Sequence, residues 1–356
     1  MSRAGNAIDN TAMLLAGDVG GTKTLLGLFM SKPERPSTID VGEFTTLEYD
    51  GLEPMIESFL ASRKVEARHI EAATFGAAGA VIDEVARLTN VPWSIDCSAV
   101  AKRLGFGRTY VLNDLQALAY AVTVLEDHEL SVLQRGVRHP SGNAAVIAAG
   151  TGLGEAMLHN VKGRLIPVAS EGGHADFAAR TPREIEMLRE LMRVYGRVSV
   201  ETVLSGPGLV NVYQFTHNEL GAGPLETTAS LAQAHLCAAV GPVSDPSDLP
   251  ARISKAGMER LCDRCVEALD MFVSVYGAES GNIALQAAAT AGVYVGGGIA
   301  PKILPALESG PFLEAFRDKK PMADYVAAIP VFVILNPDAG LLGAAVHAQQ
   351  VSVPAA

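Results

Sequence analysis

The sequence predicts an α/β fold built from two related halves. Strand-like runs alternate with helical ones along the 356 residues, and this alternation indicates sheets covered by helices. The order strand, glycine turn, strand occurs twice, at residues 14–29 and again, as a weaker echo, at residues 144–158. With 49% apolar residues, the chain has enough core material for two domains.

The first glycine turn lies in "LLAGDVGGTKTLLGLF", which fits neither of the two best-known phosphate-loop patterns. Counting from Gly17 puts Thr22 where the P-loop requires its second glycine. The dinucleotide fingerprint must open a helix, whereas residues 23–30 are rich in Leu, Thr and Phe and predict a strand. In such a hairpin the paired glycines let backbone N–H groups approach an anion. Asp18, at the end of the first strand, could then face a metal.

The other elements follow from shorter patterns. Strands are predicted in "ATFGAAGAVI", "TYVLND", "AAVIAAG", "GVYVGGG" and "IPVFVIL", and helices in "GLEPMIESFLASRK", "DLQALAYAVTVLE" and "PREIEMLRELMRVYG". Residues 1–12 are interpreted as a loose tail, and 221–250 as the loosest internal region. Residues 280–301 carry no charge, but Asn282, Gln286 and several glycines favour a helix, a strand and a glycine turn over a membrane span.

Composition limits the partners. The net charge of -11 argues against nucleic acid or an anionic membrane as the main partner, because both reward a basic surface. The four cysteines are too few and too unevenly placed for a secreted disulfide framework, which favours a cytoplasmic protein. Cys262 and Cys265 form a C-x-x-C, but no second pair or nearby histidine completes a zinc set, and the spacing around them is helical. We interpret them as ordinary helix cysteines rather than a redox or metal pair.

Two further glycine segments suit a nucleotide. Around the second turn the dinucleotide pattern fails again, because the sixth position from Gly150 is Glu155. Each half would place one turn at the edge of a cleft, with the phosphate chain of a nucleotide between the turns. Residues 296–298 are consecutive glycines after a strand, so they either admit a flat adenine or ribose against bare backbone or form a crowded turn.

Several side chains could perform chemistry. Asn113 and Asp114 lie where a strand ends and a helix begins, the position at which open α/β sheets gather ligands. Asp114 is either a helix cap or a base that deprotonates an attacking hydroxyl, and a helix N-terminus would keep it ionised. Glu171 and His174 flank two glycines in an irregular loop, and Glu201 precedes a Ser-Gly-Pro-Gly break. Such groups can each serve several hydroxyls of a polyol, although each could also be a solvated loop charge.

A metal site is the other interpretation of the segment "EGGHAD". Its three ligand-type side chains, Glu171, His174 and Asp176, stand close together in the sequence. The segment lacks the paired histidines of a metallohydrolase motif, and we therefore favour sugar binding.

The ordered set of motifs resembles the bacterial-type ATP-dependent glucokinases of the actin, hexokinase and Hsp70-like ATPase superfamily. The resemblance runs from about residue 13 to the end of the chain and rests on "GDVGGT", "NDLQALA", "GTGLG", "EGGHADF", "SGPGLVN", "GGGIAP" and "NPDAGLLGAA". It implies a two-domain actin-like ATPase fold of ribonuclease H-like type, each domain a mixed sheet flanked by helices, that closes over glucose and MgATP. Residues 13–124 with 336–356 would form the small domain and residues 125–335 the large one.

The resemblance also implies roles for individual residues. Phosphate positions would be Asp18, Gly20, Gly21, Thr22, Thr151, Gly152 and Gly154, and the adenosine-side turn would be Gly296, Gly297 and Gly298. Asp114 matches the general base that takes the proton from the 6-hydroxyl of the sugar, and it matches a sugar-binding position together with Asn113, Glu171, His174 and Glu201. Asp18 would act on Mg²⁺ indirectly, and Lys23 would have no catalytic role. A cytoplasmic homodimer is expected.

Other functions stay open at this point. A kinase for another hexose or an amino sugar would keep the same motifs, since a pocket that pairs hydroxyls can admit an altered substituent. The joint presence of the base and the sugar-type residues argues against a non-catalytic sugar sensor, and the sugar-type loops argue against an actin-like filament. Ala80 stands where the related kinases often carry proline, and the cysteine-rich zinc motif of the related repressor-kinase family, with its DNA-binding members, is absent.

Overall fold

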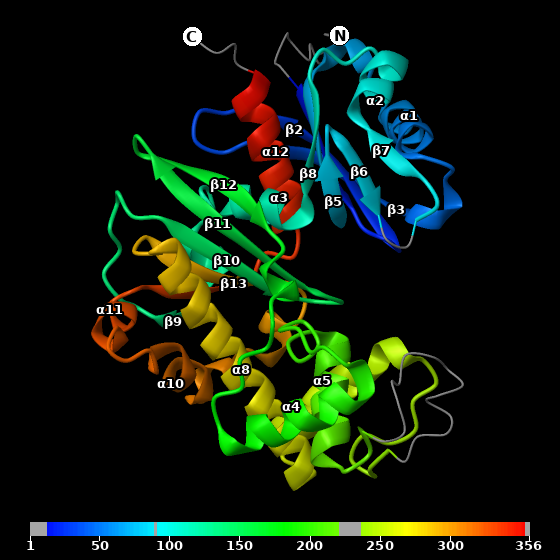
Figure 1. Cartoon of the computed structure of the whole chain (residues 1–356). Helices are drawn as coiled ribbons and strands as arrows, with labels where there is room; N and C mark the ends of the chain where they lie inside the picture. Colours follow the sequence, from blue (N-terminus) through cyan, green and yellow to red (C-terminus); the bar gives the residue numbers. More distant parts are fainter. Residues whose placement is uncertain (1–12, 89–90, 221–235, 353–356) are drawn as a thin grey trace, which may run out of the picture. The chain divides into compact units, whose positions relative to one another are not determined.

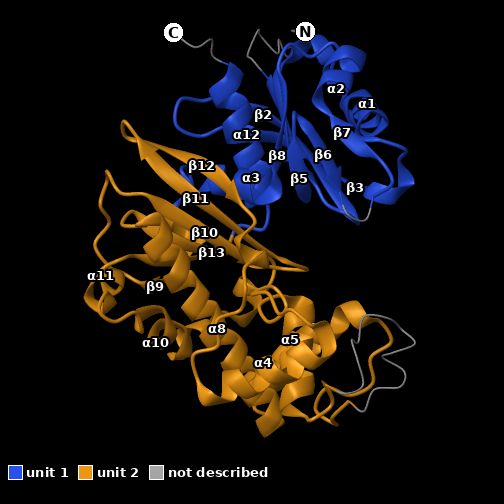
Figure 2. Ribbon diagram, in the orientation of Figure 1, with its two compact units in different colours: residues 1–126, 336–356 blue, residues 127–335 orange. Residues whose placement is uncertain are grey.

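The chain folds into two compact units (Figure 2), residues 1–126 with 336–356 and residues 127–335. The structure, a computed structural model, describes residues 13–88, 91–220 and 236–352 (Figure 1). The predicted loose tail, and residues 221–235 of the predicted loose internal region, lie outside the described residues. Each unit has its own sheet and helices, which confirms the α/β class.

The first unit is built on a five-stranded sheet in the order β3-β2-β1-β4-β8. The strands are β1 (Met13–Val19), β2 (Lys23–Met30), β3 (Ser37–Thr45), β4 (Ile70–Ala77) and β8 (Thr109–Asn113). The first three strands pair antiparallel, whereas β1, β4 and β8 are parallel to one another. The predicted strand at residues 23–30 is therefore confirmed with its bounds.

Helices cover both faces of this sheet. They are α1 (Leu52–Arg63), α2 (Cys97–Leu104), α3 (Asp114–Val122) and α12 (Ala339–Ser352). Side chains of a strand alternate between faces, so Leu14 and Ala16 of β1 pack with Leu341 of α12, while Leu15 packs on the side that buries Leu52 of α1. Through α12, the end of the chain becomes part of the first unit, where it contacts β1, β4 and α3.

The second unit contains a six-stranded sheet in the order β12-β11-β10-β13-β14-β9. The strands are β9 (Leu130–Gln134), β10 (Ala144–Ala149), β11 (Leu153–Val161), β12 (Arg164–Ser170), β13 (Gly292–Gly296) and β14 (Val331–Ile334). The helices are α4 (Pro182–Tyr195), α5 (Gly206–Thr216), α7 (Leu249–Met258), α8 (Asp263–Ala287), α9 (Leu304–Glu308), α10 (Pro311–Arg317) and α11 (Ala323–Ala327).

Helix α8 organises the core of the second unit. It runs against β10, β11 and β13 and also contacts α5, α7 and α10 (Figure 1). A Cβ atom at Gly277 or Gly281 would overlap the backbone of α10 at Phe312 or Phe316, so these two glycines permit the close approach of the two helices. The result is one continuous apolar core between the sheet and its helices.

The two sheets repeat one topology. In each, three consecutive strands pair antiparallel, the first of them pairs parallel with a later strand, and that later strand pairs parallel with a further one. Strands β1, β2, β3, β4 and β8 correspond in this order to β10, β11, β12, β13 and β14. The weak echo between residues 14–29 and 144–158 therefore reflects two halves of the same architecture.

One of the predicted strands is divided in the structure. The segment at residues 73–82, predicted as one strand, divides into β4 and β5 (Gly79–Ile82). Strand β5 joins β6 (Val85–Leu88) and β7 (Ser94–Asp96) in a separate three-stranded sheet. A Cβ atom at Gly79 would overlap the Arg87 carbonyl, so this glycine allows the two backbones to meet at the break.

A membrane span is not found in the described residues. None of the helices within residues 13–88, 91–220 and 236–352 combines the length and the apolar character that crossing a bilayer requires. In the uncharged segment 280–301, α8 gives way to β13 and a glycine turn, as the sequence predicts.

Candidate functional site

One edge of the first sheet collects the predicted site residues of the first unit. Because β1, β4 and β8 are parallel, their carboxyl ends meet at the same edge, and the register places Val19, Ala77 and Asn113 in one row. Asp18 lies one residue before this row and Asp114 one residue after it. Adjacent strands are about 4.8 Å apart, so the turn after β1 and the start of α3 are separated by about two strand spacings.

The turn after β1 is held from outside. Thr46, which follows β3, donates its hydroxyl to the Gly20 carbonyl at 2.8 Å, and its N–H donates to the Thr22 carbonyl at 2.9 Å. Within the turn, the Gly20 N–H donates to the Lys23 carbonyl at 3.0 Å. Thr22 is exposed at the tip. The bonds fix the backbone of the turn while leaving the Thr22 hydroxyl at the surface, as a phosphate turn requires.

Asp18 faces a second carboxylate from the other end of the chain. Burial, and then the negative charge of Asp338, raise the pKa of Asp18 from its ordinary value of 3.8 to about 6, against the opposite effect of Lys23. The backbone at the start of α12 is close, since a Cβ atom at Gly340 would stand 2.9 Å from Asp18 Oδ2. Two neighbouring carboxylates that repel one another form a set of oxygen ligands suited to a divalent cation such as Mg²⁺.

Asn113, not Asp114, caps helix α3. The Asn113 side chain accepts from the Leu115 N–H at 2.9 Å, and its amide donates to the Gly79 carbonyl at 3.3 Å. Asp114 is the first residue of the helix, and its Oδ1 also accepts from the Leu115 N–H, at 2.8 Å. The alternative interpretation of Asp114 as the cap is therefore replaced, and the helix N-terminus surrounds this carboxylate with positive partial charge.

The second unit repeats the glycine turn between β10 and β11. The Gly150 N–H donates to the Gly152 carbonyl at 2.8 Å, and the Gly206 N–H at the start of α5 donates to the Gly150 carbonyl at 2.8 Å. Thr151 is exposed at the tip, like Thr22 in the first unit. This turn contains the predicted phosphate residues Thr151, Gly152 and Gly154.

Glu201 connects the second turn to the predicted sugar residues. Its Oε2 accepts from the Leu153 N–H at 2.8 Å, and its Oε1 lies 3.7 Å from His174 Nδ1. A Cβ atom at Gly152 would stand 2.6 Å from Glu201 Oε2, so the turn passes directly over this carboxylate. The Glu201 N–H donates to the Gly173 carbonyl at 2.9 Å. The structure therefore brings Glu201, His174 and the second turn together.

The loop at residues 171–174 presents its polar side chains outward. Glu171 and His174 are exposed, whereas Gly173 between them is buried against Leu153. A Cβ atom at Gly173 would overlap the Leu153 carbonyl, so only glycine lets this loop lie on the start of β11. The loop and the second turn are thus a single packed structure with exposed polar groups.

The third glycine segment lies at the same sheet edge. Register pairs Ala148 with Gly296, and the Ile299 N–H donates to the Ala149 carbonyl at 3.3 Å. Gly297 has a φ of 82°, a conformation that favours glycine, and a Cβ atom there would overlap Ala149. Nothing lies within 4 Å of a Cβ atom built on Gly298. The segment is therefore crowded at Gly297 and open at Gly298. Binding of adenine or ribose at this segment stays a prediction.

The family follows from comparison with known proteins. The family model described as Glucokinase matches residues 15–351. A glucokinase of Nostoc sp. is 39% identical over 342 residues, which cover 94% of this chain and 98% of the relative. The chain belongs to the glucokinase family. It is therefore an ATP-dependent sugar kinase.

Solved structures agree on the fold of this glucokinase-family chain. A glucokinase from an Antarctic psychrotroph has a TM-score of 0.80 at 27% identity and covers 95% of this chain and 99% of that one. A ROK family glucokinase from Streptomyces griseus, solved with glucose and AMPPNP, has a TM-score of 0.63 at 22% identity, covering 95% of this chain and 99% of that one. The actin-like ATPase fold predicted from the motifs is thereby confirmed.

Three residues near the site of this glucokinase-family chain carried no role in the sequence interpretation. Asp338 lies in the quoted segment "NPDAGLLGAA", where an acidic residue just before a helix is the signal that could have found it. Tyr276 of α8 donates its hydroxyl to the Gly296 carbonyl and accepts from the Ala149 N–H, both at 3.1 Å. Thr46 follows an ordinary strand, and nothing in its sequence context points to the turn that it holds.

A buried acid lies beneath the sugar-side loop. Burial, and then Glu279, raise the pKa of Glu155 from 4.5 to about 8. The backbone of Gly172 approaches this carboxyl group so closely that a Cβ atom there would overlap Glu155 Oε2. Glu155 is therefore neutral at pH 7 and forms part of the floor beneath the loop.

The two metal interpretations have different outcomes. Asp176 pairs with Arg197, whose Nε donates to Asp176 Oδ1 at 2.8 Å, and within the described residues Glu171, His174 and Asp176 do not converge into a cluster of potential metal ligands. The interpretation of the C-x-x-C, by contrast, is wrong about its surroundings. Cys262 precedes α8 as its cap residue, and the fold brings a histidine and a third cysteine, distant in sequence, to the pair.

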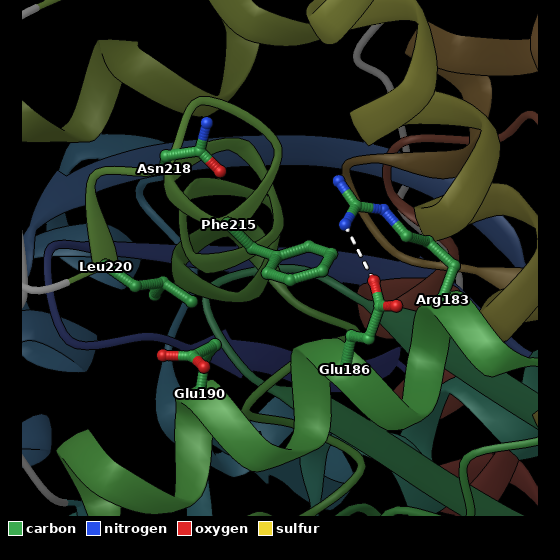
Figure 3. A pocket seen from close by; sticks show the side chains of 6 residues that line it. All are labelled: Arg183, Glu186, Glu190, Phe215, Asn218 and Leu220. Carbon is green, nitrogen blue, oxygen red and sulfur yellow. Dashed lines mark hydrogen bonds and ion pairs between the residues drawn. The ribbon is translucent and has the colours of Figure 1, made fainter.

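The second unit also has a surface pocket (Figure 3) whose lining includes none of the predicted site residues. It is lined by Arg183, Glu186, Glu190, Phe215, Asn218 and Leu220. Arg183 Nη1 pairs with Glu186 at 2.9 Å, and its guanidinium carbon lies 4.2 Å from the centre of the Phe215 ring. Because Arg183 is held by its own neighbours, we assign no role in catalysis to this pocket.

Proposed function

We propose that this chain transfers the γ-phosphoryl group of ATP to the 6-hydroxyl of D-glucose, giving glucose 6-phosphate and ADP. Membership of the glucokinase family supports the reaction class. One observation supports the assignment of the catalytic base: Asp114 begins a helix at the same sheet edge as the turn after β1. A base and an anion-binding turn at one edge are what phosphoryl transfer to an alcohol needs.

Asp114 is proposed as the general base. Its carboxylate is favoured in the ionised form by the N-terminus of α3, so it can accept the proton of the 6-hydroxyl as the phosphorus–oxygen bond forms. The proton moves to the Asp114 carboxylate, the hydroxyl oxygen gains the phosphoryl group, and ADP leaves with the electron pair of the broken bond. Asn113 would orient a sugar hydroxyl beside it.

The second unit is proposed to hold the remaining sugar hydroxyls and part of the phosphate chain. Glu171, His174 and Glu201 provide carboxylate acceptors and an imidazole that donates or accepts. Thr151, Gly152 and Gly154 provide the second phosphate turn, and Gly298 provides open backbone for the adenosine side. The contacts that support this proposal lie within the second unit. Glu201 accepts a hydrogen bond from the Leu153 N–H next to the second turn, and it lies 3.7 Å from His174 in the loop at residues 171–174.

Mg²⁺ is part of the proposal. Asp18 and Asp338 fit a hard divalent cation, because each supplies carboxylate oxygens and their mutual repulsion is relieved when positive charge is added. Bound Mg²⁺ would supply charge neutralisation on the phosphate oxygens of ATP. The contact of Asp18 with the ion is proposed as indirect, through water.

A coupled ADP-release assay tests this function. Purified chain is given a panel of hexoses and amino sugars, with and without Mg²⁺. We expect the highest kcat/KM with D-glucose, and loss of turnover when Mg²⁺ is chelated. Higher kcat/KM with another hexose or an amino sugar would change the acceptor, and no sugar-dependent ADP release with any of them would leave a sugar-binding protein without kinase activity.

The proposal also includes a cytoplasmic homodimer that takes neither nucleic acid nor membrane as a partner. The family resemblance supports the dimer, and the net charge of -11 supports the exclusion of polyanionic partners. Light scattering coupled to size-exclusion chromatography tests the oligomeric state, since a mass of about one chain at assay concentrations contradicts a dimer.

A further inference from the structure

Four potential metal ligands meet in the second unit, away from every residue assigned to catalysis. They are His217, Cys237, Cys262 and Cys265, and their ligand atoms all lie within 4.8 Å of one another. His217 follows the end of α5, Cys262 caps α8, and Cys265 is in the first turn of that helix. Cys265 is buried and Cys237 and Cys262 are half-buried. Residue spacing in the sequence does not reveal this set of ligands, because three separate segments of the chain contribute to it.

The distances in this Cys₃His cluster match a tetrahedral site. With zinc–sulfur bonds of about 2.3 Å, two thiolates on one tetrahedral ion stand about 3.8 Å apart. Cys237 Sγ lies 3.7 Å from Cys265 Sγ, and Cys262 Sγ lies 3.7 Å from His217 Nε2. A disulfide would bring two sulfur atoms to about 2.05 Å. The sulfur atoms are therefore spaced for a shared ion rather than for a direct bond.

The imidazole is oriented as a ligand. His217 Nδ1 lies 2.9 Å from the Tyr213 carbonyl, so the proton on Nδ1 is donated there and Nε2 turns its lone pair to the cysteines. Ligating histidines in proteins usually donate their second N–H in this way. The centre of the imidazole ring also lies 4.0 Å from the centre of the Tyr213 ring, a contact that helps to hold its orientation.

Two positively polarised groups adjoin the cluster. Cys262 and Cys265 stand at the N-terminus of the 25-residue helix α8, where the backbone dipoles favour thiolates. Arg264 reaches back to the His217 carbonyl at 3.3 Å and adds a positive charge next to the cluster. Cys237 is positioned by its own N–H, which donates to the Tyr213 hydroxyl at 2.9 Å. Tyr213 therefore orients two of the four ligands.

We propose that His217, Cys237, Cys262 and Cys265 bind one Zn²⁺ ion in a closed, structural site. Four protein ligands leave no open position for substrate, which distinguishes a structural ion from a catalytic one. The ion would join the end of α5 to the start of α8. Helix α5 begins at Gly206, just after Glu201, so the zinc would stabilise the far end of a helix whose near end adjoins the sugar residues.

Metal analysis of the wild-type chain tests the site directly. The full-length protein, purified without chelator under reducing conditions, is expected to hold about one zinc per chain. After replacement by Co²⁺, its absorption spectrum should show the thiolate charge-transfer bands and the intense visible bands of a tetrahedral cysteine-rich site. Less than about 0.1 zinc per chain, together with no such spectrum after Co²⁺ addition to reduced protein, overturns the proposal.

Variants connect the metal to the named ligands. Cys262→Ser and His217→Asn are expected to lower the zinc content at least fivefold, while Cys97→Ser, a buried cysteine of the first unit, leaves it unchanged. Zinc content equal in Cys262→Ser and wild type overturns the assignment. If a ligand variant does not fold, the Co²⁺ spectrum of the wild type still decides.

Thiol titration separates zinc from the rival redox interpretation. In the folded wild type a thiol reagent should react slowly with Cys237, Cys262 and Cys265 until a strong chelator releases the metal, whereas the buried Cys97 should react slowly both before and after chelation. Under denaturing, metal-free conditions all four cysteines should react. Two unreactive cysteines that appear only after reduction identify a disulfide and overturn the zinc site. None of these readouts uses kinase activity, so they are independent of the proposed glucose reaction.

Discussion

The carboxylate of Glu201 accepts a hydrogen bond from the backbone N–H of Leu153 at 2.8 Å. Leu153 opens β11 directly after the second glycine turn, while the other oxygen of Glu201 lies 3.7 Å from His174 Nδ1. A residue expected to bind only sugar thus also fixes the backbone of the phosphate turn. The proposed sugar and nucleotide sites of the second unit would therefore share one side chain.

Glu201→Ala should therefore impair both substrates. Removal of the carboxylate leaves the Leu153 N–H without this acceptor and loosens the turn, so we expect KM to rise about tenfold or more for both glucose and ATP. His174→Ala is the matched control, because it removes a sugar contact while the bond to Leu153 remains. Steady-state kinetics with each substrate varied in turn give the comparison. An unchanged KM for ATP in Glu201→Ala would show that the turn does not depend on this bond.

Asp114→Asn should abolish most of the turnover. The amide keeps the size of the side chain but cannot take the proton of the 6-hydroxyl, so kcat is expected to fall by about 10² to 10⁴. KM for glucose should change much less, since the hydrogen-bonding shape is retained. Asp50→Asn, at an exposed position of the same unit, serves as the control. Near-normal kcat in Asp114→Asn assigns the base to another residue.

Asp18→Asn should make the free protein more stable and its use of MgATP worse. The folded pKa of Asp18 is about 6 against 3.8, so the unfolded chain releases this proton first and the wild type loses stability as pH rises between these values. Asparagine removes that cost, and the free energy of unfolding at pH 7.5 should increase by about 1–3 kcal/mol. KM for MgATP should rise at least tenfold. Urea denaturation and kinetics check the two effects, and lower stability contradicts the first.

Glu155→Gln should flatten the dependence of stability on pH. Between pH 4.5 and about 8 the unfolded chain ionises Glu155 while the folded chain keeps the proton, so the free energy of unfolding falls as pH rises through this range. The slope from this group is at most about 1.4 kcal/mol per pH unit. Urea denaturation from pH 6 to 8 should show a shallower fall in the variant. Glu308→Gln, at an exposed position, should retain the wild-type slope.

Tyr276→Phe should lower the stability of the protein and weaken its binding of ATP. The hydroxyl that joins Ala149 of β10 to Gly296 of β13 is buried, so its loss should cost about 1–3 kcal/mol of stability. Because both bonds lie next to glycine turns, KM for ATP should rise more than KM for glucose. Tyr325→Phe, on a half-buried helix position, is the control. A variant with wild-type stability and KM for ATP would remove Tyr276 from this role.

Local sequence was sufficient for the backbone features of the site. The two glycine turns, the strand at residues 23–30 and the start of a helix at Asp114 were all predicted, because each depends on a few neighbouring residues. Glycine and β-branched or apolar patterns restrict backbone conformation wherever they occur in the chain. The break between β4 and β5 was missed, because it follows from contact with the distant backbone of Arg87.

The sequence by itself determined which backbone turns could bind anions and in which order the motifs of the family follow one another. Only the tertiary structure decided which side chains share a place: Asp18 with Asp338, Glu201 with Leu153, and Cys262 with His217. Conformational preference acts over one or two turns of chain, whereas such pairs form when sheets and helices from distant segments pack around a core. The difference explains why the glycines could be read from the sequence and the Cys₃His cluster could not.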